Sequence, residues 1–206
     1  MFLAIDTSAG TSVAIVDALG VVHAECDCAD TRKHAEVVGD FIYTCLAEAG
    51  LAVTDLTGVV AGMGPGPFTG LRVGIVAARA FAFGAGLPLY PVVTHDAIAL
   101  GETGPTLIAT DARRKEFYWS TYTGTDDAGL PIRDAGPALS PAAELPTHVP
   151  NYDHYALREA ATVHAASLAR LAHILKANGR EFAGEEALYL RSPDISLSAG
   201  PKRVTA

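Results

Sequence analysis

The residues AIDTSAGTSVAIVD (4–17) join two short apolar runs through a turn of hydroxyl-bearing and small residues. The small and β-branched residues of these runs predict β-strands over 2–5 and 12–16. A hairpin turn at 17–20 then leads to a third expected strand over 21–25. The chain is therefore expected to begin as an antiparallel meander.

Helical periodicity begins after this meander. Apolar residues over 34–49 recur on one broad face, and Gly50 supplies a stop signal. A buried strand over 58–61, a helix over 69–83 with Thr69 as a candidate cap, a strand over 87–93 and a short helix over 95–100 follow. Three antiparallel strands followed by crossover connections predict an α/β fold with a ribonuclease H-like mixed sheet.

The second half of the chain predicts a smaller lobe. Turn-forming residues at 101–105 indicate a boundary, which divides the chain into domains 1–103 and 104–206. Paired strands are expected at 106–110 and 116–123. Residues 124–154 are expected to be mostly loop with room for one short strand, followed by a helix over 160–178 and a last strand over 187–191. The tail after residue 192 has too little apolar content to fold alone. The two halves are candidates for distant copies of one sheet design.

Composition limits the classes of function. The 206 residues are half apolar and carry a net charge of −8, which argues against this chain alone gripping a nucleic-acid backbone. Cys26, Cys28 and Cys45 form no CxxC pair and are interpreted as small, reduced, partly buried residues. No signal peptide and no membrane segment are predicted, and a cytoplasmic location is expected.

The glycine-rich stretch GMGPGPFTGLR (62–72) raises the question of phosphate binding. It lacks the lysine of a P-loop and the acidic partner of a dinucleotide site. In folds of the sugar kinase and actin type, an aspartate at the end of the first strand orients a metal-bound water. The candidate nucleotide or anion loop is therefore Asp6, Thr7, Ser8, Gly64, Gly66, Thr69 and Gly70. Local hydrogen bonding at the strand end is the favoured interpretation of the three residues after the first strand.

The helix over 69–83 is apolar nearly all round, apart from Arg72 and Arg79. A surface helix normally has a polar face. Small residues recur at three- and four-residue spacing, which permits close approach by another helix: Gly70, Gly74, Ala77 and Ala78. One side of this helix is expected on its own sheet and the other on a partner subunit.

No catalytic or metal-ligating set stands out. His34 is followed by valine at positions 37 and 38, where a helical metal site would need a second histidine. The charged residues at 111–116 are interpreted as a solvated turn. No serine nucleophile is predicted, and a metalloprotease or a two-metal nuclease lacks its ligands. An ATP-dependent phosphotransferase or ATPase of the actin-like fold, suggested by Asp6 and the glycine loop, is the alternative to a binding protein.

Five motifs stand out along the chain: AIDTS (4–8), HAEVV (34–38), GMGPGPFTGLRVGI (62–75), DARRKEFYW (111–119) and LYLRSP (188–193). Together they resemble the bacterial TsaB family, formerly called YeaZ. The resemblance spans nearly the whole chain, and Pro67 departs from the family's usual serine in the glycine loop.

The resemblance implies an actin-like ATPase (ASKHA) fold with a complete first lobe and a reduced second lobe. It also implies a role in making threonylcarbamoyladenosine in tRNA, as a scaffold for the catalytic paralogue TsaD, whose HxxxH metal pair is here His34 and Val38. The ATPase TsaE joins that pair, and tRNA is reached only through the complex. Carried onto this sequence, the partner interface is Val38, Phe41, Ile42, Cys45, Arg72, Val73, Val76, Ala77 and Ala80.

Two expectations concern the state of the isolated chain. An uncovered apolar interface favours self-pairing into a homodimer. No tightly bound cofactor is expected, and weak binding of ATP or ADP with Mg²⁺ within the complex stays open.

Overall fold

The computed structural model describes residues 1–191, and the predicted tail at 192–206 lies outside this range. A five-stranded sheet in the order β3-β2-β1-β4-β5 forms the first half of the molecule. Its first three strands pair antiparallel, and β1, β4 and β5 run parallel. This order confirms the ribonuclease H-like prediction. The strands are β1 (Phe2–Asp6), β2 (Thr11–Val16), β3 (Val22–Cys28), β4 (Gly58–Gly62) and β5 (Leu89–Val92).

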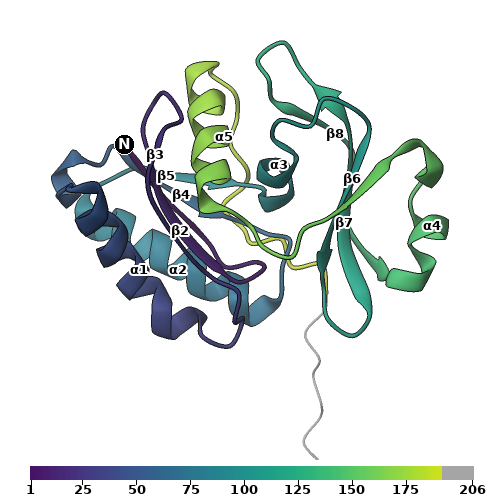
Figure 1. Ribbon diagram of the computed structural model, residues 1–206, viewed down its shortest axis with the longest axis horizontal. Coiled ribbons are helices and arrows are strands. Elements are labelled where there is room, and N and C mark those ends of the chain that lie inside the picture. Colours follow the sequence, from purple (N-terminus) through teal and green to yellow (C-terminus); the bar gives the residue numbers. More distant parts are fainter. Residues whose placement is uncertain (192–206) are drawn as a thin grey trace, which may run out of the picture.

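Helices cover both faces of this sheet (Figure 1). Helices α1 (His34–Ala49) and α2 (Phe68–Ala85) pack on one face and α5 (Ala165–Ala177) on the other. Alternate residues of β1 divide between the two cores, with Leu3 and Ile5 facing α1 and α2, and Phe2 and Ala4 facing α5. Because both faces are covered, β1 and β2 are buried throughout, which explains their continuous apolar composition.

The second sheet has the order β8-β7-β6-β9. Its first three strands pair antiparallel and β9 runs parallel to β6, which repeats the arrangement of the first sheet without a fifth strand. The structure thus agrees with two lobes of one design, the second reduced. The strands are β6 (Thr106–Asp111), β7 (Glu116–Thr125), β8 (Pro131–Pro141) and β9 (Ala156–Glu159).

Short helices complete the described chain. Helix α3 (Thr94–Ala99) follows β5 and packs against α5 and the second sheet. The predicted division at residues 103 and 104 falls between α3 and β6, and α5 returns to the first sheet after the second sheet is complete. The remaining helices are α4 (Leu145–His148) and the 3₁₀ turns Val53–Asp55, Ala142–Glu144 and Tyr152–His154.

Three sequence predictions for the second half differ from the structure, one in the length of a strand, one in the start of a helix and one in the absence of a strand over 187–191. Residues 131–141 form an eleven-residue strand in place of the expected loop with one short strand, because β8 lies at the sheet edge and tolerates its prolines. The helix predicted from residue 160 begins at Ala165, and β9 lies just before it. Residues 187–191 form no strand, although the Leu188 N–H donates to the carbonyl of Met63 at 2.9 Å.

Candidate functional site

The glycine-rich stretch, the end of β1 and the start of α3 meet in one buried junction. Asp6 is the last residue of β1 and is 1% exposed. Its Oδ1 accepts hydrogen bonds from the Ser8 N–H at 2.7 Å and the Ser8 hydroxyl at 2.5 Å. Its Oδ2 accepts one from the Thr94 hydroxyl at 2.7 Å. Burial raises the pKa of the Asp6 carboxyl above its usual range, against the lowering effect of these hydrogen bonds.

Thr94 connects this carboxyl to the glycine loop. Its hydroxyl accepts a hydrogen bond from the Gly64 N–H at 3.1 Å, and its N–H donates to the Gly64 carbonyl at 2.8 Å. Gly64 has a φ of +91°, a conformation that side-chain-bearing residues rarely adopt. The two contacts with Thr94 therefore hold the loop in a shape that requires glycine.

Close packing explains the other glycines of the loop. A Cβ on Gly62 would overlap the Asp6 carboxylate, and one on Gly66 would lie 2.8 Å from the Ser8 Cβ. A side chain at either position would therefore require the neighbouring atoms of Asp6 or Ser8 to move. The glycines admit the chain's own β1–β2 turn into the space beside the loop.

Thr7 links the β1–β2 turn to the first turns of α2 through hydrogen bonds. Its hydroxyl donates to the Gly70 carbonyl at 2.7 Å and accepts from the Gly74 N–H at 2.9 Å. A Cβ on Gly74 would overlap the Thr7 hydroxyl. The glycine-rich loop thus serves as a close-packed support that sets the direction of α2.

The structure brings together six of the seven residues of the candidate anion loop. Thr69 is the exception, since it is exposed and Pro67 occupies the N-cap of α2, so the expectation of a Thr69 cap is wrong. The hydroxyls of Thr7 and Ser8 and both oxygens of Asp6 bind groups of this chain. These hydrogen bonds agree with the local hydrogen-bonding interpretation of the strand end, and binding of a nucleotide phosphate at this turn stays a prediction.

His34 opens α1 and is 7% exposed. Its Nδ1 lies 2.8 Å from the Thr11 hydroxyl, and its ring packs close to Gly70. Burial lowers the pKa of His34 below its usual range, and the charge of Arg113 acts in the same direction. One turn later, Val38 is buried in the core. This histidine therefore packs where α1, the β1–β2 turn and α2 meet.

The predicted interface residues divide by burial. Val38 and Cys45 are buried in the core between sheet and helices, so their side chains do not reach the surface. Phe41, Ile42, Val73 and Ala77 are half-buried against the same core. The exposed members are Arg72, Val76 and Ala80.

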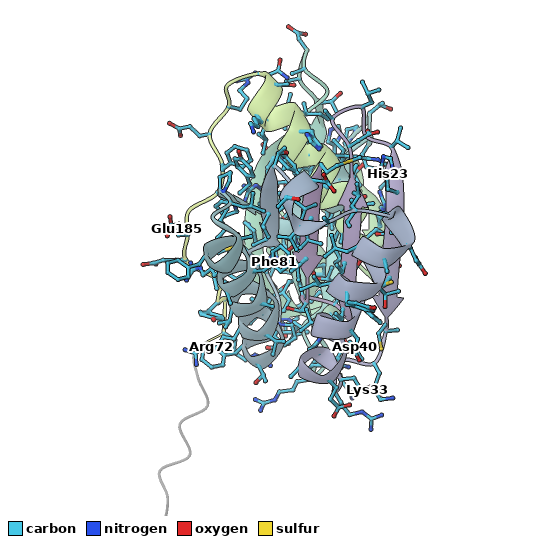
Figure 2. The ribbon with its side chains drawn as sticks, turned by 90° about the vertical axis from the view of Figure 1, so that its left-hand side faces the viewer. His23, Lys33, Asp40, Arg72, Phe81 and Glu185 are labelled. Atoms are coloured by element: carbon cyan, nitrogen blue, oxygen red, sulfur yellow. The ribbon has the colours of Figure 1, made fainter. Side chains whose placement is uncertain are left out.

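An apolar stripe remains on the outer side of α1 and α2, which face the viewer in Figure 2. Val76, Ala80 and Phe83 lie at spacings of four and three residues on α2, and Tyr43 is exposed on α1. Val76 is 61% exposed and Phe83 is 90% exposed. Sequence reasoning missed Phe83 and Tyr43, although the spacing of Phe83 three residues after Ala80 could have revealed the first of them.

Helix α2 is long and apolar enough to cross a membrane by length and composition, with a mean hydropathy of 1.3 over residues 68–85. Its inner side, which includes Leu71, Ile75 and Ala78, is buried against the first sheet. Core helices of soluble proteins pass the same test of length and hydropathy.

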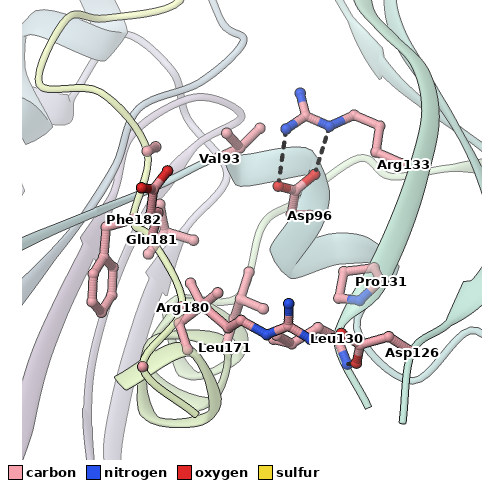
Figure 3. A pocket seen from close by; sticks show the side chains of 14 residues that line it. Val93, Asp96, Asp126, Leu130, Pro131, Arg133, Leu171, Arg180, Glu181 and Phe182 are labelled. Atoms are coloured by element: carbon pink, nitrogen blue, oxygen red, sulfur yellow. Dashed lines mark hydrogen bonds and ion pairs between the residues drawn. The ribbon is translucent and has the colours of Figure 1, made fainter. Parts of the chain in front are cut away.

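A cavity of about 660 Å³ opens between α5, α3 and the start of β8 (Figure 3). On its wall the Arg133 guanidinium of β8 reaches Asp96 of α3, with Nε 3.2 Å from Oδ1. The Tyr122 hydroxyl donates to the same carboxylate at 2.7 Å. Burial raises the pKa of Asp96, and the charge of Arg133 opposes that shift. These groups tie α3 to the second sheet, and no sequence motif points to them.

The family model described as TsaD, tRNA N6-adenosine threonylcarbamoyltransferase, matches residues 28–176. Among curated relatives, an uncharacterized protein of Mycobacterium bovis is 45% identical over 116 residues, which are 56% of this chain and 52% of that protein. The tRNA threonylcarbamoyladenosine biosynthesis protein TsaB of Escherichia coli is 38% identical over 134 residues, 62% of this chain and 57% of that protein. The chain spans about half the length of the curated relatives it matches.

Solved structures agree over a greater length. A Pseudomonas aeruginosa protein described as similar to peptidase YEAZ is 26% identical with a TM-score of 0.75, covering 92% of this chain and 99% of that one. The structure titled YeaZ from the same organism gives 25% identity and a TM-score of 0.74 over the same shares. The chain belongs to the family that the TsaD model describes and, within it, to the TsaB (YeaZ) proteins.

Proposed function

We propose that this chain is the non-catalytic partner subunit of the cytoplasmic assembly that makes N6-threonylcarbamoyladenosine in tRNA. It pairs with a TsaD paralogue through α1 and α2, and the ATPase TsaE joins that pair. The TsaB relatives, named for threonylcarbamoyladenosine biosynthesis, support the pathway.

The observation that carries the pairing is the apolar stripe of Tyr43, Val76, Ala80 and Phe83. A helix that exposes residues four and three positions apart, two of them large and apolar, has the pattern of a helix whose outer side is covered by another surface. In the absence of TsaD, the same stripe supports pairing between two copies of this chain.

The non-catalytic role rests on the surroundings of His34. The position one turn along α1 holds Val38, whose side chain is buried, and the His34 Nδ1 faces a threonine hydroxyl. Metal catalysis would need a second ligand beside this histidine. The net charge of −8 supports recruitment of tRNA through the complex rather than by this chain alone.

The test is the light-scattering mass of the chain, alone and mixed with the TsaD of the same organism, on a size-exclusion column. The variant Val76→Glu places a charge in the centre of the stripe and is expected to abolish the heavier species. Leu19→Glu is the matched control, because Leu19 is 90% exposed in the β2–β3 turn, away from α1 and α2. A mixture in which both variants pair as well as the unmodified chain contradicts the proposed interface.

A further inference from the structure

Five of the chain's 15 lysine and arginine residues lie in two loops, although the chain is acidic overall. We call them the cationic ridge: Arg32, Lys33, Arg113, Arg114 and Lys115. All five are exposed. The first two precede α1, and the other three form the turn between β6 and β7.

A contact between the two lobes joins these loops. The Arg113 guanidinium donates to the Thr31 hydroxyl, which lies next to Arg32. Two carboxylates are in the same loops, and each pairs within its own loop, Asp30 with Arg32 and Asp111 with Arg113. Among the described residues, Lys33 and Lys115 take part in no ion pair, so each loop keeps a lysine whose charge is not paired with a carboxylate.

The backbone of the β6–β7 turn favours residues other than the ones it carries. Arg113, Arg114 and Lys115 have φ values of 66°, 57° and 61°. The left-handed conformation costs residues with a Cβ roughly 1–2 kcal/mol each, and glycine or asparagine normally occupies it. Three consecutive long cationic residues in this conformation indicate that the charges, rather than the stability of the turn, account for these residues.

The start of α1 shows a second local conflict. Lys33 is the N-cap residue, and within residues 1–191 no side chain caps this helix end. A helix N-terminus carries a partial positive charge and is stabilised by anions; Glu36 in the first turn supplies one negative charge, and the lysine at the N-cap opposes its effect. An anion bound at the ridge would relieve this conflict and would pair with the cations of the turn.

We propose that the cationic ridge binds the phosphate backbone of RNA, so that within the complex this otherwise acidic subunit adds a contact of its own to the tRNA. The choice of tRNA as the RNA rests on the proposed function. Exposed lysines and arginines on protruding turns, with an uncapped helix N-terminus beside them, match successive phosphates of a polyanion rather than a folded apolar surface.

The experiment titrates a fluorescein-labelled, unmodified tRNA transcript with the full chain, alone and with TsaD, from 25 to 200 mM KCl. The variant is Lys33→Gln with Lys115→Gln, one change in each loop. Loss of two phosphate contacts is expected to reduce the slope of log K against log salt by about 1.4–1.8 and to weaken binding most at low salt. The control is Arg170→Gln with Lys176→Gln, an equal charge change on α5, where Arg170 contacts Gly20 at the opposite end of β3 from the ridge.

A slope reduced equally by both double variants would overturn the proposal, as would the absence of tRNA binding in every titration. Displacement of the RNA by poly-glutamate of equal charge would assign the ridge to an acidic protein and would also overturn it. Failure of the pairing with TsaD is measured separately, by the light-scattering mass.

A third variant, Lys115→Gly, tests the backbone strain of the turn. It is expected to raise the unfolding midpoint, because glycine adopts the left-handed conformation without strain, and to weaken RNA binding, because a cationic contact is removed. An unfolding midpoint that falls contradicts the strain argument.

Discussion

The Thr94 hydroxyl donates to Asp6 Oδ2 at 2.7 Å and accepts from the Gly64 N–H at 3.1 Å, so one side chain joins β1, the glycine loop and α3. Thr94 is fully buried. Valine has nearly the same shape without the hydroxyl. Thr94→Val is expected to lower the free energy of unfolding by about 1–3 kcal/mol, because it leaves buried polar groups unpaired.

Chemical denaturation monitored by circular dichroism measures this change. Thr123→Val, at an exposed strand position, is the control and is expected to change stability by less than about 0.5 kcal/mol. Equal effects of the two substitutions would mean that the hydroxyl of Thr94 does not stabilise the junction.

Two glycines of α2 should respond in opposite directions to alanine. Gly74→Ala would push a methyl group into the Thr7 hydroxyl, so it is expected to destabilise the protein and disturb the start of α2. Gly84 lies in the last turns of the same helix, and a methyl group on its Cα would meet no neighbouring atom within 4 Å. Gly84→Ala is therefore expected to stabilise by about 0.5–1 kcal/mol. Thermal unfolding of both variants measures the contrast, and a stabilising Gly74→Ala would contradict the close contact with Thr7.

His95 should make stability sensitive to acid. Its ring is fully buried, with Nδ1 2.8 Å from the Ser120 hydroxyl and Nε2 3.0 Å from the Thr110 hydroxyl. Burial lowers the pKa of His95 to about 3, and the charge of Arg133 adds to this effect. In the unfolded chain His95 has a pKa of about 6.5, so between pH 6.5 and pH 3 the unfolded chain binds a proton that the folded chain does not bind. The free energy of unfolding therefore decreases as pH falls through this range, by up to about 1.4 kcal/mol per pH unit.

The measurement is the free energy of unfolding of the unmodified chain and of His95→Gln between pH 4 and pH 7. The difference between the two is expected to shrink as pH falls, because the variant has no histidine to protonate on unfolding. Proton NMR offers an independent check, in which the ring signal of His95 should not titrate above pH 4. A His95 signal that titrates near pH 6 contradicts the predicted burial effect.

The three cysteines should differ in reactivity. Cys45 is fully buried and its thiol donates to the Val13 carbonyl at 3.3 Å, whereas Cys26 and Cys28 are half-buried on β3. Burial raises the pKa of the Cys45 thiol well above its usual range, with the neighbouring Cys26 adding to the shift. In native protein at pH 8, a thiol reagent is therefore expected to modify Cys45 last. Cys45→Ala should remove the slowest phase, and a fast-reacting Cys45 in mass-mapped peptides would contradict this order.

The first lobe is predictable because its local signals agree with its tertiary contacts. The short continuous apolar runs, the helical face of 34–49 and the left-handed Gly50 at its end all specify the same elements that the folded first lobe contains. In β8, by contrast, prolines and a glycine indicate loop, and only its edge position permits a strand. In β9, the sequence ALRE has no strand pattern and depends on pairing with β6.

The sequence predicts which residues of the candidate site lie at the strand end, but it does not predict which distant residues they contact. Sequence spacing places Asp6, Thr7 and Ser8 at a strand end, but the partners Thr94 and Gly74 lie more than 60 positions away. The ridge is recognisable in the sequence only as a charged turn, since positive φ values at 113–115 and the contact with Thr31 depend on the folded chain. Spacing along the chain carries no information on such contacts.

The return of α5 to the first sheet has a consequence for the growing polypeptide. The core on that face of the sheet combines Phe2 and Ala4 with Leu168 and Leu171, which are synthesised more than 160 residues later. Until α5 has left the ribosome, one face of the meander remains uncovered, however early its strands have paired. Folding of the first lobe therefore waits for nearly the whole described chain, and such distant contacts are expected to make the final step slow.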